Sequence, residues 1–117
     1  MKSLYKILAG QNQKARVYFK NYAFYAKEIK KTAGKFFTDA KVVIFGSVVR
    51  QDYKPDSDID ILIISSEIPE DLFEQAKVKV KIRALFPDAP LELHLITPPQ
   101  YKNWYKRFVK RDYIEVA

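Results

Sequence analysis

The sequence predicts an α/β or α+β domain with one small sheet of about three strands. A helical spacing of apolar residues covers much of the N-terminal third. Short β-branched or alternating segments follow, and the segments between them carry helix-start signals. A chain of 117 residues can bury one core and not two, and it shows no repeat or linker. We therefore expect a single domain over residues 1–117.

The first predicted element is a helix from about Gln11 to Phe37. Its apolar positions recur at spacings of three and four, and they are Tyr18, Tyr22, Tyr25, Ile29, Ala33 and Phe36. Most of the lysines fall elsewhere, so the helix has one side suited to packing. We expect the tyrosines to belong to the core rather than to form a platform on which bases stack.

Three segments are predicted to be strands. Lys41–Phe45 is short and β-branched, which is typical of a buried strand that Gly46 ends. Asp58–Ile64 follows a connecting segment that contains Pro55. Leu91–Thr97 alternates strictly between apolar and other residues after a proline-rich turn, so it is the third predicted strand.

Two further helices are predicted in the second half of the chain. Ile68–Asp71 gives a helix start with proline and acidic residues, and the helix is expected to reach Phe86. The alternation within residues 77–82 would also suit an edge strand. The last helix opens at Pro98–Pro99 and presents one apolar face, formed by Tyr101, Tyr105, Phe108 and Val109.

The charge of the chain is unevenly distributed. The net charge is +7, but residues 42–90 carry nine acidic and six basic residues, whereas residues 1–41 carry ten basic and two acidic ones. The middle therefore attracts cations and its flanks attract anions. This pattern argues against a uniform basic coat for nucleic acid. The simplest interpretation of the N-terminal charge is a solvated helix face.

Composition excludes several kinds of site. The chain has no cysteine, which excludes disulfides and thiolate metal sites and fits a reducing compartment. The single histidine, His94, excludes a multi-histidine metal site within one chain. No apolar run approaches the roughly 20 residues that span a bilayer. The apolar stretch near the N-terminus is interrupted too often by polar residues to be a signal peptide. We expect a cytoplasmic protein.

Two aspartates one residue apart, Asp58 and Asp60, open the second predicted strand. Residues at i and i+2 of a strand lie on the same face, so the two carboxylates repel each other. A half-buried pair of this kind is costly unless protons or cations compensate. Magnesium prefers oxygen ligands and bridges to substrate phosphates, so it is the predicted compensator. The alternative is a solvated strand end, and Ser57 could bond a carboxylate or end the loop.

Glu92 is the third candidate acid. In the third predicted strand it shares a face with His94, opposite the three leucines. If a neighbouring strand brings Glu92 beside Asp58 and Asp60, three carboxylates would bind two magnesium ions. One ion would activate an attacking hydroxyl, and the other would steady a leaving pyrophosphate. His94 is expected to be structural or to support Glu92 rather than to be catalytic.

Gly46–Ser47 is a candidate phosphate site. A strand that ends in glycine and turns into a short helix points backbone N–H groups at whatever lies in the turn. The Ser47 hydroxyl adds a donor there. Taken alone, however, the pair is more simply a turn with a serine cap.

One combined motif resembles the signature of the DNA polymerase beta nucleotidyltransferase superfamily. It consists of Gly46-Ser47, ten intervening residues and Asp58-Ile59-Asp60. Within it, the sequence is similar to the minimal nucleotidyltransferases (MNT) over nearly the whole chain. The similarity includes the preceding helix, the acid of "LELHLIT" and the aromatic "YKNWYKRF" segment. Two positions depart from the family pattern. Gln51 stands where relatives commonly have glycine, and Glu92 stands where many have aspartate.

The resemblance implies a polymerase beta-like nucleotidyltransferase fold, a small mixed sheet flanked by helices. It implies transfer of a nucleoside monophosphate, AMP from ATP being favoured, with release of pyrophosphate. Asp58 and Asp60 would hold Mg²⁺, and Glu92 would ligate the activating ion and could act as base. Gly46–Ser47 would grip the terminal phosphates. Arg50 would either reach a phosphate or pair with the acidic loop.

The resemblance also implies a partner. Minimal nucleotidyltransferases are commonly paired with a helical HEPN-type toxin, and several act as its antitoxin by attaching AMP to a toxin tyrosine. One alternative is a non-catalytic antitoxin that binds its partner through the C-terminal aromatics, although core packing explains these residues more simply. They are Tyr101, Trp104, Tyr105 and Phe108. Another is nucleotide addition to RNA, which is less favoured because no stacking groove is evident. A homo- or hetero-oligomer is compatible with each of these.

Overall fold

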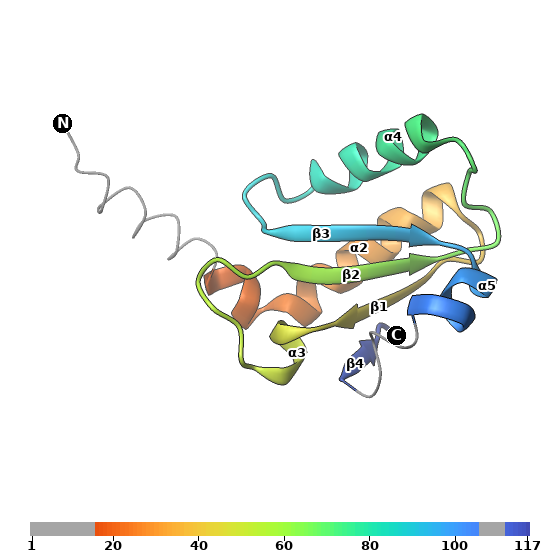
Figure 1. Ribbon diagram of the computed structural model, residues 1–117. Helices are drawn as coiled ribbons and strands as arrows, with labels where there is room; N and C mark the ends of the chain where they lie inside the picture. Colours follow the sequence, from red (N-terminus) through yellow and green to blue (C-terminus); the bar gives the residue numbers. More distant parts are fainter. Residues whose placement is uncertain (1–15, 106–111) are drawn as a thin grey trace.

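The computed structural model describes residues 16–105 and 112–117, except for the side chains of Trp104 and Tyr105. Residues 16–20 are helical. The elements that follow are α2 (Tyr22–Phe36), β1 (Lys41–Phe45), α3 (Ser47–Arg50), β2 (Ile59–Ile64), α4 (Leu72–Arg83), β3 (Leu91–Ile96), α5 (Pro98–Gln100), the π-helix η1 (Tyr101–Tyr105) and β4 (Tyr113–Glu115). They form an α/β fold, as predicted (Figure 1).

The sheet is mixed and has the strand order β3-β2-β1-β4. Strand β1 is antiparallel to both β2 and β4, whereas β2 and β3 are parallel. The parallel pair is joined through α4, because parallel neighbours need a long crossover. The register places Asp60 between Phe45 on β1 and Glu92 on β3.

Helices α2 and α4 pack on one face of the sheet (Figure 1). The main core lies between them and the strands, and its strand residues include Val42, Ile44, Ile59, Ile61, Ile63, Leu91, Leu93 and Leu95. The opposite face buries a smaller cluster of Val43, Leu62, Ile64 and Ile96. Because strand residues alternate between faces, Asp60, Glu92 and His94 share the face of this smaller cluster, away from α2 and α4.

The N-terminal helical segment is interrupted. Residues 11–15 of the predicted helix lie outside the described residues, and a turn at Asn21 separates residues 16–20 from α2. The Asn21 side chain donates a hydrogen bond to the carbonyl of Val17, at 2.9 Å. Tyr18 and Tyr25 lie with ring centroids 4.8 Å apart, and both rings meet Phe86. The tyrosine stripe is thus used for packing, as predicted.

The helix between β2 and β3 is shorter than predicted. It begins at Leu72, after the Asp71 carboxylate accepts a hydrogen bond from Phe73 N at 2.8 Å, and it ends at Arg83 rather than Phe86. The alternating residues 77–82 are helical. Val78 and Ile82, one helical turn apart, are both buried, so core packing decides against an edge strand there.

The sheet has one strand more than the sequence predicts. Strand β4 has three exposed residues and no apolar run, and it forms by pairing with β1. The predicted last helix begins at Pro98 and continues as η1, while Phe108 and Val109 lie outside the described residues. In the described part of the chain, no helix has the length and apolar character needed to cross a bilayer.

Candidate active site

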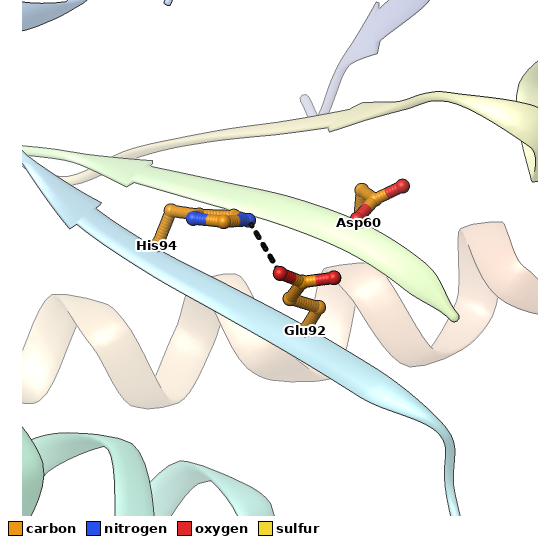
Figure 2. Close-up of side chains that lie close together, drawn as sticks. All are labelled: Asp60, Glu92 and His94. Atoms are coloured by element: carbon orange, nitrogen blue, oxygen red, sulfur yellow. Dashed lines mark ion pairs between the residues drawn. The ribbon is translucent and has the colours of Figure 1, made fainter.

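Two carboxylates from neighbouring strands face each other on the face of the sheet that is opposite α2 and α4. Asp60 and Glu92 are each the second residue of their strand, and the parallel register sets them directly opposite. Figure 2 shows their side chains together with His94. One ligand atom from each of these three residues lies within 4.8 Å of the others. The structure therefore brings two of the three predicted acids together.

The electrostatics of Asp60 reflect this crowding. The pKa of Asp60 is raised to about 6. Burial of the side chain is the largest cause, followed by the charge of Glu92, a side-chain hydrogen bond with Glu92 and the charge of Asp58. The charge of Arg50 acts in the opposite direction. Asp60 is therefore largely ionised at neutral pH at an energetic cost, which a bound cation would offset.

Gly46 lies directly against Asp60, one member of the acid pair. It has a φ of 86°, a backbone conformation that favours glycine. A Cβ at this position would lie only 2.6 Å from Asp60 Oδ2, so no other residue fits without a shift. Ser47 follows as the first residue of α3 and is partly exposed. The glycine turn and the acid pair thus form one continuous site.

Asp58 lies at the edge of this site rather than in a strand. The second strand begins at Ile59, not at Asp58 as predicted, and Asp58 is exposed in the preceding loop. Among the described residues, the clustered ligand atoms come from Asp60, Glu92 and His94 without Asp58. The charge of Asp58 still contributes to the raised pKa of Asp60.

Arg50 closes α3 and pairs with the loop that leads to Asp58. Its Nε lies 3.1 Å from Asp52 Oδ2, and both side chains are about half exposed. The sequence left two partners open for Arg50, a phosphate or the acidic loop, and in the structure Arg50 pairs with the acidic loop. Gln51, which follows, has a φ of 64° and is the non-glycine residue with positive φ among those described.

His94 lies beside Glu92, as expected for a residue that supports this acid. Its Nε2 lies 3.7 Å from Glu92 Oε1, and its ring centroid is 6.1 Å from that of Phe45. Burial lowers the pKa of His94, an effect that the charge of Glu92 opposes and that of Lys79 reinforces. The strict alternation of "LELHLIT" placed His94 on the face of Glu92, and this was the available signal for a third donor.

Comparison with known proteins identifies the family. Residues 26–116 match the family described as "Nucleotidyltransferase domain". The chain belongs to this family. The nucleotidyltransferase match spans all four strands and every predicted site residue, so the predicted superfamily is confirmed.

Individual nucleotidyltransferase relatives agree with this assignment. A Methanocaldococcus jannaschii protein with the provisional name protein adenylyltransferase is 33% identical over 91 residues, which are 76% of this chain and 84% of that protein. A solved structure provisionally described as a nucleotidyltransferase is 37% identical, with a TM-score of 0.63, and covers 78% of this chain and 96% of its own. Another, from Sulfolobus solfataricus, has a TM-score of 0.58 at 24% identity, covers 92% of this chain and 84% of its own, and supports the fold alone.

Proposed function

We propose that this chain is a magnesium-dependent nucleotidyltransferase that transfers AMP from ATP to an acceptor and releases pyrophosphate. The observation that carries the proposal is the pair of facing carboxylates, Asp60 and Glu92, beside Gly46. Membership of the nucleotidyltransferase family supports the reaction type. The provisional name of the Methanocaldococcus jannaschii relative supports adenylyl transfer to a protein.

The residues present fit a divalent cation. Carboxylate oxygens are the ligands that magnesium prefers, and the raised pKa of Asp60 marks negative charge that the protein itself does not compensate. Asp60 and Glu92 would hold the metal, with Asp58 joining from the loop edge. Bound magnesium would supply charge neutralisation at the phosphate oxygens.

The chain's own residues would position the reactants. The acceptor oxygen forms a bond to the α-phosphorus of ATP while the bond from that phosphorus to the bridging oxygen breaks, and pyrophosphate leaves. Glu92 would take the proton of the acceptor hydroxyl. At Gly46 the missing side chain leaves room for phosphates to approach, and Ser47 would donate its hydroxyl to them. Arg50 would stabilise their charge after leaving Asp52.

The acceptor in this proposal is a tyrosine of a HEPN-type toxin, so that the chain acts as an antitoxin. The resemblance to minimal nucleotidyltransferases supports this partner. Helices α2 and α4 cover the other face of the sheet, so a tyrosine from a partner protein could approach Asp60 and Glu92.

Intact-protein mass spectrometry tests this proposal. A small helical HEPN-type protein from the same genome is incubated with the chain, ATP and Mg²⁺, and the mass of this partner is measured. We expect the partner to gain AMP, with fragmentation assigning the AMP to a tyrosine. The matched control is the Asp60→Asn, Glu92→Gln double variant, which should give no gain. An unmodified partner after prolonged incubation with the wild-type chain would refute the proposal.

A second candidate is a module that neutralises a partner protein by binding alone. The observation that favours it is the outer face of α4, where Leu72, Phe73 and Val80 are 77%, 67% and 66% exposed. Exposed apolar groups of this size are common in protein interfaces. An Asp58→Asn, Asp60→Asn variant separates the two candidates. A binding module with these changes would still neutralise its partner, whereas the enzyme would not.

A further inference from the structure

We propose that His94 is a third protein ligand of the metal centre, so that this site binds Zn²⁺ or Ni²⁺ more tightly than a site of carboxylates alone. The inference rests on the proposed function, because it concerns the same centre. It changes the predicted role of His94 from a support for Glu92 to a direct nitrogen donor. It also changes the expected cation selectivity.

The distances allow one cation to contact all three residues. A donor atom from each of Asp60, Glu92 and His94 lies within 4.8 Å of the other two, and His94 Nε2 is 3.7 Å from Glu92 Oε1. Donors around one divalent ion with bonds of about 2.1 Å are separated by about 3 to 4 Å. Small side-chain movements, without a change in the strands, would close the remaining difference.

The strand register fixes the three side chains on one face. Glu92 and His94 are two residues apart on β3, so both point to the same side. Asp60 is opposite Glu92 across the parallel pair, and Leu62 is opposite His94. Figure 2 shows the imidazole Nε2 directed toward the Glu92 carboxylate. The nitrogen therefore faces Glu92, and the ring centroid of Phe45 lies 6.1 Å from that of His94.

The donor set determines the preferred cation. Magnesium takes oxygen ligands almost exclusively, whereas imidazole nitrogen suits transition-metal ions such as Zn²⁺ and Ni²⁺. One imidazole added to two carboxylates should therefore strengthen the binding of these ions and leave Mg²⁺ nearly unaffected. If His94 only orients Glu92 through their 3.7 Å contact, its loss should weaken all of these cations alike.

The test uses the full chain without nucleotide, and its main measurement is nitrogen NMR of the histidine ring. The sequence contains one histidine, so the ring gives a single set of signals. Titration with diamagnetic Zn²⁺ should shift the Nε2 resonance strongly. Ring nitrogens that stay at their metal-free positions at saturating Zn²⁺ would overturn the inference, and this measurement needs no variant.

Calorimetry of His94→Gln supplies the second measurement. We expect the Zn²⁺ affinity to fall by about tenfold or more and the Mg²⁺ affinity to change less than about threefold. Glu92→Gln is the matched control, because it should weaken both cations. An equal loss of Zn²⁺ and Mg²⁺ affinity in His94→Gln would also overturn the inference. AMP transfer supported by Mg²⁺ would survive that result, so the proposed function is tested separately.

Discussion

Asp60 and Glu92 face each other across the parallel strands β2 and β3, and burial together with the charge of Glu92 raises the pKa of Asp60. The pair lies on the sheet face that α2 and α4 leave open. A folded protein retains such a destabilising arrangement most readily where a ligand offsets it. The position of this pair on the sheet and the raised pKa of Asp60 are therefore the basis for placing the active site here.

Replacing Asp60 by asparagine should stabilise the protein at neutral pH. Because the pKa of Asp60 is raised from 3.8 to about 6 on folding, the folded state binds this proton more tightly than the unfolded state. The contribution of Asp60 to stability therefore falls as pH rises from about 4 to about 6. Urea unfolding of Asp60→Asn at pH 7 should show a gain of about 1 kcal/mol, allowing for partial solvent exposure, and no gain near pH 4.

The control for this prediction is Asp56→Asn, which changes an exposed carboxylate in the same loop region. It should unfold at the wild-type urea concentration at both pH values. An Asp60→Asn variant that is less stable than the wild type at pH 7 would mean that Asp60 is already compensated by the protein.

Gly46→Ala should disturb the site directly. The new methyl group would lie 2.6 Å from Asp60 Oδ2, and alanine disfavours the φ of 86° found there. We expect a loss of about 1–2 kcal/mol in the free energy of unfolding and at least a tenfold loss of cation-dependent ATP binding. Gly34→Ala is the control, since an added Cβ there meets nothing within 4 Å. It lies in α2 and should stabilise slightly. Unchanged stability and ATP binding in Gly46→Ala would disprove the close approach.

Gln51→Gly should stabilise the turn after α3. Gln51 adopts a φ of 64° and a ψ of 26°, a left-handed conformation that glycine reaches without the steric cost that a side chain adds. The relief is partly offset by the greater freedom of glycine in the unfolded chain, so we expect a gain of up to about 1 kcal/mol in thermal or urea unfolding. Gln51→Ala keeps the side-chain cost and should show no gain. A destabilised glycine variant would indicate that the Gln51 side chain makes a stabilising contact.

Asp39 should give a pH dependence of the opposite sign to Asp60. Hydrogen bonds, first from the Ser65 hydroxyl and then from Ser66, lower the pKa of Asp39 from 3.8 to about 2. The resulting stabilisation is complete above about pH 4 and is lost as pH falls toward 2. Asp39→Asn should therefore lower the urea midpoint more at pH 7 than at pH 2.5. An equal change at both pH values would mean that the carboxylate charge plays no part.

The faces of the strands could be predicted from the sequence, because strand residues alternate with a period of two. This rule put Glu92 with His94 and separated them from the leucines of the same strand, as observed. It also put Asp58 with Asp60, but the strand begins at Ile59, so Asp58 lies in the loop. Alternation determines a face only within a strand, and it does not fix where pairing begins.

The pairing of distant segments could not be predicted in the same way. Nothing local specifies that Asp60 is opposite Glu92, because that register depends on the whole β2-α4-β3 crossover. Strand β4 gave no local signal either, since it exists through its pairing with β1. The resemblance to the nucleotidyltransferase family supplied the expectation that the acids converge.

Calorimetric titration of ATP with and without Mg²⁺ tests most directly whether the acid pair beside Gly46 forms a cation-dependent nucleotide site. We expect ATP to bind the wild-type chain only when the divalent cation is present. Binding should weaken at least about 100-fold in the Asp60→Asn, Glu92→Gln double variant. Equal ATP affinity in the wild type and the double variant, or equal affinity with and without the cation, would show that the acid pair does not form a cation-dependent nucleotide site.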